Sequence, residues 1–292
     1  MVVLAIAAGP VAHAQRPQDR ERAMYVTVTD QNGAPVTGLT PDDFIVREDG
    51  IQREVLRVEP ATEPIEITLV LDTSDVASSA IADLRRALTA FIKDAAKGND
   101  IAITTIGGRP QTVQNHTGNT VLLEKGIGRL FAEQGSGAYL LEGLSSVAAG
   151  VAKRAPERAA IIAILMRSAP EFSNLPYESV VKALRDCGAT FDAIVLEAGT
   201  PTAPPARGEQ VTAIHDRDMV LDEATRATGG VYRQALSSMA LTPELASIAA
   251  QLRGQYRLVY ARPESLIPPE RTEVTAKKPG LTARGTLVAT HR

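Results

Sequence analysis

The feature that most constrains the fold is a regular alternation, over residues 65–261, of short apolar runs with longer amphipathic stretches. Residues 65–71 are dense in β-branched side chains, and residues 159–166 are apolar throughout, as in a strand that is covered on both faces. After the first run, apolar residues recur with helical spacing at Ile81, Leu84, Leu88, Phe91 and Ala95. This alternation predicts an α/β domain built on a parallel sheet.

The same patterns give the expected order of elements. Strands are predicted at residues 65–71, 101–106, 112–114, 159–166, 190–196, 231–232 and 256–260. Helices are predicted at residues 81–95, 121–131, 139–153, 177–187, 218–227 and 243–253. Residues 199–208 are too rich in proline for regular structure. The run His215-Asp216-Arg217-Asp218 precedes a predicted helix, so we expect Asp216 or Asp218 to be its N-cap rather than part of a ligand cluster.

Both ends of the chain carry short strand and turn signals instead. Residues 24–60 contain β-rich runs, an Asn32-Gly33 turn and a single helical turn capped by Thr40, and the tail from Arg262 is similar. The expected organisation is an N-terminal β segment at 15–62, an α/β domain at 63–262 and a C-terminal β segment at 263–292. Because neither segment is long enough to bury a core alone, we expect the two to pack together as one small β module.

Residues 1–14 have the pattern of a signal peptide. An uncharged apolar stretch ends in Ala12-His13-Ala14, an A-x-A cleavage signal, and is shorter than the roughly 20 residues of a membrane helix. No basic residue precedes the stretch, so the true start of translation can lie further upstream; the alternative is a buried N-terminal strand or helix. The pattern predicts an exported protein, periplasmic or extracellular, without a stable membrane span.

Composition excludes several classes of function. A formal net charge of −3 gives no electrostatic case for binding nucleic acid or anionic lipid. The single cysteine, Cys187, excludes an intrachain disulfide framework and a cysteine-based zinc site, and the four scattered histidines form no HExxH motif. No catalytic residue is therefore assigned.

Several motifs resemble one family. Residues 69–74 (LVLDTS) form a strand that ends in Asp-x-Ser before an amphipathic helix, and residues 224–232 (ATRATGGVY) and 252–260 (LRGQYRLVY) follow in the expected order. Together with residues 28–33 (VTDQNG) and 39–44 (LTPDDF), they resemble bacterial secreted proteins related to von Willebrand factor A. The resemblance implies a Rossmann-like, doubly wound, mostly parallel sheet with flanking β segments from both termini, and a module that binds other proteins.

The resemblance also implies a metal-ion-dependent adhesion site, which this sequence matches only in part. Asp72 and Ser74 occupy the first two positions of the Asp-x-Ser-x-Ser motif, but Val76 occupies the third. Ala138 replaces the expected threonine, and Arg167 or Ser168 stands at the expected second carboxylate. Mg²⁺ demands near-ideal octahedral oxygen ligands, so we expect a degenerate site, no cofactor, and helix N-capping as the role of Asp72 and Ser74.

The sequence thus predicts an exported, non-enzymatic module that binds another protein without a metal. Its expected binding edge lies at the carboxyl ends of the strands and includes Asp75, Ser136, Arg167 and Ser168. Arg167 is expected either to receive an acidic residue of the partner or to pair with Glu171. Two alternatives remain open: an adhesion module that binds Mg²⁺ at Asp72 and Ser74, and a hydrolase acting at the same face. The partner and the oligomeric state stay undetermined.

Overall fold

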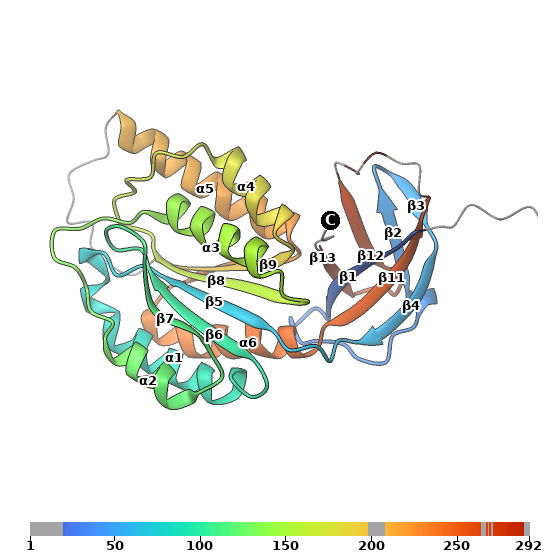
Figure 1. Ribbon diagram of the computed structural model, residues 1–292, viewed down its shortest axis with the longest axis horizontal. Helices are drawn as coiled ribbons and strands as arrows, with labels where there is room; N and C mark the ends of the chain where they lie inside the picture. Colours follow the sequence, from blue (N-terminus) through green and yellow to red (C-terminus); the bar gives the residue numbers. More distant parts are fainter. Residues whose placement is uncertain (1–19, 198–207, 264–266, 268, 270, 289–292) are drawn as a thin grey trace, which may run out of the picture.

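The computed structural model describes residues 20–197, 208–263, 267, 269 and 271–288. The predicted signal peptide at 1–14 and nearly all of the proline-rich segment 199–208 lie outside the described residues. Within them, the chain forms an α/β part and a smaller β part that lie side by side (Figure 1). No helix of the described residues is long and apolar enough to cross a membrane.

A six-stranded sheet forms the centre of the α/β part, in the order β10-β9-β8-β5-β6-β7. Its strands are β5 (Glu66–Leu71), β6 (Asp100–Thr105), β7 (Gln111–Thr117), β8 (Ala159–Met166), β9 (Ala189–Leu196) and β10 (Tyr232–Ala235). Every neighbouring pair is parallel except β6 and β7. All eight residues of β8 are buried, as its uninterrupted apolar run predicts.

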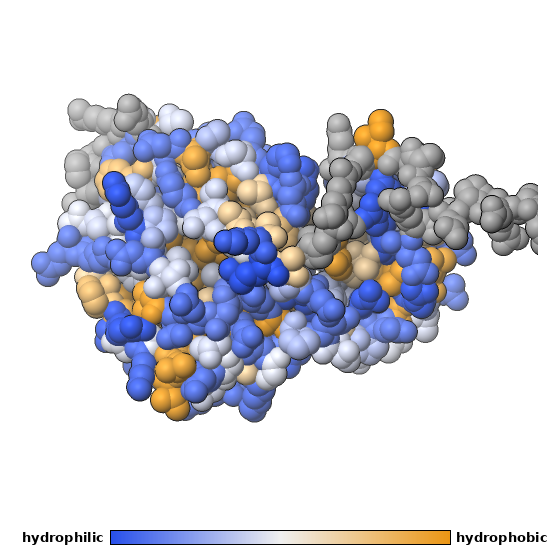
Figure 2. Space-filling view, in the orientation of Figure 1, coloured by the Kyte–Doolittle hydropathy of each residue, from blue (hydrophilic) through white to orange (hydrophobic). Residues whose placement is uncertain are grey.

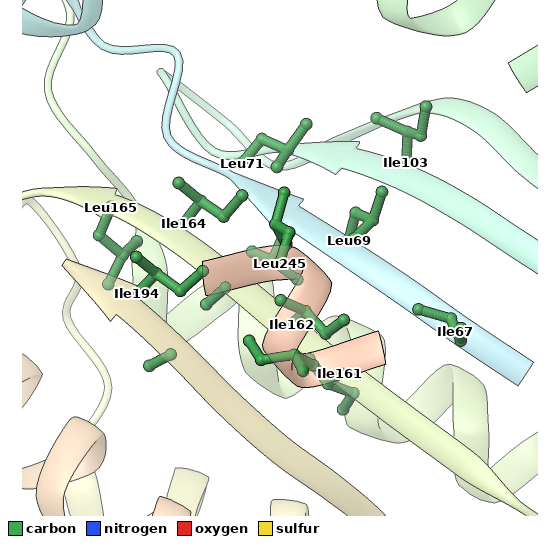
Figure 3. Close-up of a cluster of buried hydrophobic side chains, with 14 of the residues drawn as sticks. Ile67, Leu69, Leu71, Ile103, Ile161, Ile162, Ile164, Leu165, Ile194 and Leu245 are labelled. Carbon is green, nitrogen blue, oxygen red and sulfur yellow. The ribbon is translucent and has the colours of Figure 1, made fainter. Parts of the chain in front are cut away.

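Helices cover both faces of this sheet, which confirms the predicted doubly wound architecture. They are α1 (Ile81–Ala95), α2 (Thr120–Gly128), α3 (Leu140–Arg154), α4 (Tyr177–Asp186), α5 (Glu209–Ala227) and α6 (Leu241–Arg253). In Figure 1, α1, α2 and α6 lie below the sheet, and α3, α4 and α5 lie above it. The core between these layers is aliphatic: Figure 3 shows Leu69, Ile162 and Ile194 among the side chains that converge from neighbouring strands.

One helix differs from the sequence prediction. Helix α5 begins at Glu209 rather than at residue 218, so Asp216 and Asp218 lie inside the helix. The expectation that one of them is an N-cap is therefore wrong. A cap residue takes a non-helical backbone just before the first turn, which neither position offers.

The β part contains two small sheets. The first has the order β13-β1-β11-β4 and the second the order β12-β2-β3. Their strands are β1 (Arg20–Thr29), β2 (Phe44–Glu48), β3 (Ile51–Arg53), β4 (Val55–Pro60), β11 (Tyr256–Arg262), β12 (Thr272–Ala276) and β13 (Thr282–Leu287). Residues from both ends of the chain share one apolar cluster, which includes Met24, Phe44, Tyr256 and Val274.

Strand β11 corrects the predicted boundary at residue 262. It belongs to the β part, where it lies between β1 and β4 and pairs antiparallel with both. The α/β part thus ends with α6 and its C-cap Gly254. Strand β11 follows that helix directly and is largely buried, which is why its sequence resembles a further strand of the parallel sheet.

Candidate functional site

Three loops meet at the carboxyl edge of the parallel sheet, the edge where β5, β8 and β9 end. The Glu133 amide donates to the carbonyl oxygen of Thr73 at 2.8 Å, which joins the loop before α3 to the loop after β5. The Ala138 amide donates to the carbonyl oxygen of Pro170 at 2.7 Å, which joins it to the loop after β8. The structure therefore brings together the segments that contain Asp72, Ser136 and Ser168.

Asp72 is fully buried at the centre of these loops. Its Oδ1 accepts the Ser74 amide at 2.8 Å, and its Oδ2 accepts the Met166 amide at 2.9 Å. Burial raises the pKa of Asp72 above its usual range, against the opposing effect of these hydrogen bonds and of the nearby Arg217 charge. Asp72 thus ties the end of β5 to the end of β8.

The expectation that Asp72 is a helix N-cap is wrong, whereas Ser74 does occupy the N-cap position of a short 3-10 helix, although its side chain makes no capping hydrogen bond. Helix α1 begins at Ile81 after Ala80, well beyond both residues, and a short 3-10 turn (Asp75–Ser79) intervenes. Both oxygens of Asp72 are engaged by backbone amides instead. Its carboxylate holds two loops in place rather than a helix end.

The residues present do not fit the magnesium site that the resemblance implies. Buried Ala138 offers only a methyl group, and Val76 has no side-chain oxygen. The hydroxyls of Ser74 and Ser168 are buried and have no hydrogen-bond partner of good geometry among the described residues. Two hydroxyls and a carboxylate already bonded to two amides fall short of the octahedral oxygen shell of Mg²⁺. Across the described residues, no three His, Cys, Asp or Glu side chains gather as a metal site.

A second buried carboxylate, Glu171, was not predicted as a site residue. It is fully buried in the loop after β8, and its Oε1 accepts the amides of Leu140 at 3.1 Å and Ser173 at 3.2 Å. Burial raises the pKa of Glu171 to about 7. A lone glutamate in an irregular loop gives no sequence signal of burial, because glutamate is nearly always exposed.

Arg217, a buried cation of the same edge, was also missed. This residue of α5 is only 5% exposed, and its positive charge acts on Asp72 and on Glu171. Its Nη1 lies 3.4 Å from the carbonyl oxygens of both Arg167 and Ala169, and its Nε donates to Asp218 at 3.0 Å. The sequence signal that could have found it is helical spacing: in a helix that begins at Glu209, eight residues earlier, Arg217 falls on the buried face.

Arg167, the predicted cation of the site, points away from Asp72 towards other groups. Its Nε donates to Glu197 at 3.2 Å, its Nη1 donates to Asp218 at 3.1 Å, and its Nη2 donates to the Tyr232 hydroxyl. The expected pairing with Glu171 is therefore wrong. Asp75 is exposed, and Ser136 is half-buried with its hydroxyl donating to the carbonyl oxygen of Glu133 at 2.8 Å.

Large apolar side chains are exposed along the same edge. They are Phe131, Phe172, Val211, Leu236 and Met239, which we call the apolar rim. Arg85 donates to the carbonyl oxygen of Leu130, the residue before Phe131, and the Ser238 hydroxyl donates to Asp83. Phe131 and Met239 therefore lie near the start of α1. Figure 2 shows apolar patches interrupting the hydrophilic surface on the left, where the strands end in Figure 1.

Comparison with known proteins gives the fold its name. No protein-family model matches the chain, and no curated protein matches it. Among solved structures, a von Willebrand factor type A protein from Catenulispora acidiphila aligns with a TM-score of 0.50 and 12% identity, over 94% of this chain and 74% of that chain.

Two further solved structures align with the chain. BatB from Bacteroides thetaiotaomicron has a TM-score of 0.48 and 12% identity over 65% of this chain and 99% of that one. The vWF domain of the type V pili tip protein Mfa5 from Porphyromonas gingivalis has a TM-score of 0.46 and 13% identity, over 66% of this chain and 96% of that chain. On the likeness to the Catenulispora protein, which extends over both parts of the molecule, this chain has the von Willebrand factor type A fold.

Proposed function

We propose that the chain is an exported, non-enzymatic module that binds another protein at the carboxyl edge of its parallel sheet, without a metal ion. The single observation that carries this proposal is the state of that edge. Its central aspartate is closed by two backbone amides, the implied metal ligands are missing, and exposed apolar side chains surround it.

The apolar rim supplies the favourable free energy of binding. Aromatic residues and methionine are enriched in protein interfaces, and burying one such side chain contributes about 1.5–3 kcal/mol. Leu236 is 83% exposed and Met239 is 73% exposed, so a partner that covers them removes most of their surface from water. The exposed Asp75 and the half-buried Ser136 provide polar contacts between these side chains, and Arg167 presents a charge already shared with Glu197 and Asp218.

The opposite edge of the sheet supports the same choice of surface. There the β part packs against the end of α6 and the start of β9, so much of that edge is covered within the molecule (Figure 1). The carboxyl edge faces outward. Export rests on the signal-like residues 1–14.

A site-specific photo-crosslinker tests the proposal. The photoreactive amino acid replaces Phe131 or Leu236 on the apolar rim, or Leu122, an exposed leucine at the first turn of α2 that lies at the opposite edge. We expect the two rim positions to capture the same protein in the envelope of the native organism, with or without EDTA, and position 122 to capture nothing specific.

Two outcomes would contradict the proposal. Equal capture of the same protein at position 122 would remove the carboxyl edge as the binding surface. Capture at the rim that EDTA abolishes would show that binding depends on a metal, which is the alternative left open by the sequence.

A further inference from the structure

We propose that a polar cavity between α3 and the strands β6 and β7 binds a small, uncharged molecule rich in hydroxyl groups, such as a monosaccharide. The cavity has a volume of about 250 Å³, and its lining includes Thr104 on β6, His116 on β7 and Ser146 on α3. None of the described residues that line it belongs to the apolar rim. The inference therefore concerns a second site and goes beyond the proposed function.

Small side chains on the facing elements leave this space open. On β6, Ile103 points into the apolar core, whereas its neighbours Ala102 and Thr104 face the opposite side of the sheet, because side chains alternate along a strand. On α3, Ser146 and Gly150 lie one helical turn apart on the face that borders the cavity. Large aliphatic side chains at these positions would close the gap, which an alanine, a serine and a glycine do not.

The size of the cavity limits the ligand to a small molecule. Its volume of about 250 Å³ is several times the roughly 30 Å³ that one water molecule takes up in the liquid. It is slightly below the range of about 300–1,000 Å³ found for pockets that hold drug-sized ligands. A single sugar ring or a short polyol is of this size, whereas a peptide or an oligosaccharide is not.

The lining offers hydrogen-bonding groups that suit the hydroxyls of a ligand. Thr104 is only 6% exposed, and its hydroxyl has no hydrogen-bond partner among the described residues, so it is available to a molecule in the cavity. The exposed side chains of Thr112, Asn115 and Ser146 add further polar groups to the lining. Hydroxyl and amide groups both donate and accept hydrogen bonds, as the hydroxyls of a sugar or polyol do.

The charges of the lining favour an uncharged ligand. Arg154 lines the cavity, but its Nε and Nη2 donate to Glu66 Oε1 at 2.8 Å and 2.6 Å, which balances the charge of the guanidinium. His116 Nε2 lies 3.1 Å from Thr68 Oγ1 and 3.5 Å from the same oxygen of Glu66. Burial lowers the pKa of His116, so its imidazole is neutral at pH 7. A charged ligand would therefore meet no net opposite charge, whereas a neutral one needs none.

Isothermal titration calorimetry of the full chain tests the inference with neutral and charged probes. The neutral probes are ribose, glucose, galactose and the polyol mannitol. The charged probes are succinate and inorganic phosphate, which are small enough for the same cavity. We expect saturable binding of at least one neutral probe and of neither anion.

Two pairs of variants locate the binding. Thr104→Val removes the hydroxyl and keeps the shape of the side chain, and its control, Thr105→Val, makes the same change at an equally buried residue on the opposite face of β6. Gly150→Leu fills the cavity from α3, where an added Cβ meets only the flexible end of Arg154, and Ala149→Leu is the control at an exposed position of that helix.

We expect Thr104→Val to weaken binding of the neutral probe about tenfold, the effect of one lost hydrogen bond. Gly150→Leu should abolish binding, while Thr105→Val and Ala149→Leu should bind as the wild type does. Melting curves of the four variants check that each is folded.

Three results would overturn the inference. The first is that no neutral probe binds with saturation, and the second is that succinate or phosphate binds instead. The third is that a neutral probe binds equally well to the wild type, Thr104→Val and Gly150→Leu, which would place its site elsewhere. Each of these results leaves the proposed function standing, because both variants lie outside the apolar rim.

Discussion

At the scale of single residues, Gly107 shows how tightly the loops of the carboxyl edge are packed. A Cβ atom at this position would lie 2.3 Å from the carbonyl carbon of Thr73 and 2.6 Å from the amide nitrogen of Ser74. Both are backbone atoms of the loop that carries Asp72, so no side-chain rotation can relieve the clash. Glycine is needed here for close approach, and its backbone φ is not in the left-handed region.

Gly107→Ala is therefore expected to lower the free energy of unfolding by about 3 kcal/mol, the upper end of the usual cost of overpacking. The matched control is Gly128→Ala at the end of α2, where an added Cβ meets nothing within 4 Å. The control should be neutral or slightly stabilising, because alanine favours the helix. Urea denaturation of both variants measures the difference, and equal stability would show that the loops at Thr73 can separate without cost.

Arg167 gives a second prediction at this scale. Its side chain is 28% exposed and bonded to Glu197 and Asp218, which are themselves partly exposed, so solvent weakens both ion pairs. Arg167→Ala should cost about 1 kcal/mol of stability, more than Arg86→Ala, whose side chain is 71% exposed in a simple i,i+3 pair. Thermal melts of the two variants measure this difference in stability. An Arg167→Ala melting temperature identical to that of the wild type would show that these ion pairs contribute nothing to stability.

The candidate site could be predicted only in part from the sequence. Asp72 and Ser74 were found because they directly follow a clear strand and match a short motif. The orientation of Arg167 was not predictable, since Glu197 follows β9 and Tyr232 lies on β10, two strands whose spatial order no local pattern reveals. Arg217 was missed for the same reason: it is distant in sequence from the loop that it contacts.

At the scale of elements, β9 carries a buried acidic residue. Asp192 is 4% exposed on this strand, and its Oδ1 accepts the Val231 amide at 2.9 Å. Burial raises its pKa to about 6, in spite of the nearby charges of Arg233 on β10 and Arg284 on β13. In the unfolded chain an aspartate titrates near pH 4.

This difference predicts a pH dependence of stability. Between about pH 4 and pH 6 the folded state binds more protons than the unfolded state, so the stability that protonated Asp192 provides falls as the pH rises through this window and is constant above it. Asp192→Asn keeps the acceptor for Val231 but does not titrate. Its stability relative to the wild type should therefore rise by about 2–3 kcal/mol from pH 4 to pH 7.

Urea denaturation at intervals of pH measures this for the wild type and Asp192→Asn. The exposed Asp42 supplies the control, and Asp42→Asn should follow the wild-type profile throughout. Parallel profiles of the wild type and Asp192→Asn would show that Asp192 titrates in the folded state as it does in the unfolded one.

The elements themselves were largely predictable, because periodicity is a local property. The apolar runs gave β5 and β8, and the spacing of apolar residues gave α1 and α6 to within two residues at each end. The first half of α5 was missed because Asp216 and Asp218 resemble caps, and no local signal distinguishes a cap from an acidic helix interior. Strand β11 was assigned to the wrong sheet, since its pairing with β1 joins residues more than 200 positions apart.

At the scale of the whole molecule, a buried polar network joins the β part to the α/β part. Arg158, before β8, donates from Nε to Gln255 Oε1 at 3.1 Å, and Gln255 Nε2 donates to Thr27 Oγ1 on β1 at 3.1 Å. The Arg158 guanidinium also lies 5.2 Å from the centre of the Tyr25 ring. Beside it, the hydroxyls of Thr190 on β9 and Thr286 on β13 are 2.9 Å apart. The β part is thus fastened to one edge of the parallel sheet and does not cover the carboxyl edge.

The C-terminal strands complete the β part, and removing them tests whether the two chain ends form one folding unit. A chain that ends at Arg262 loses β13, which pairs with β1 over six residues, and β12, which pairs with β2 over five. Val274 on β12 also leaves the apolar cluster that covers Met24 and Phe44. We expect the melting temperature to fall by several degrees and proteolysis within residues 25–58 to accelerate, because β1 and β2 then each lose a neighbouring strand. A chain that ends at Val288 keeps both strands and should behave as the full-length protein does. An unchanged melting temperature and an unchanged cleavage rate in the chain ending at Arg262 would show that the N-terminal strands fold without the C-terminal ones.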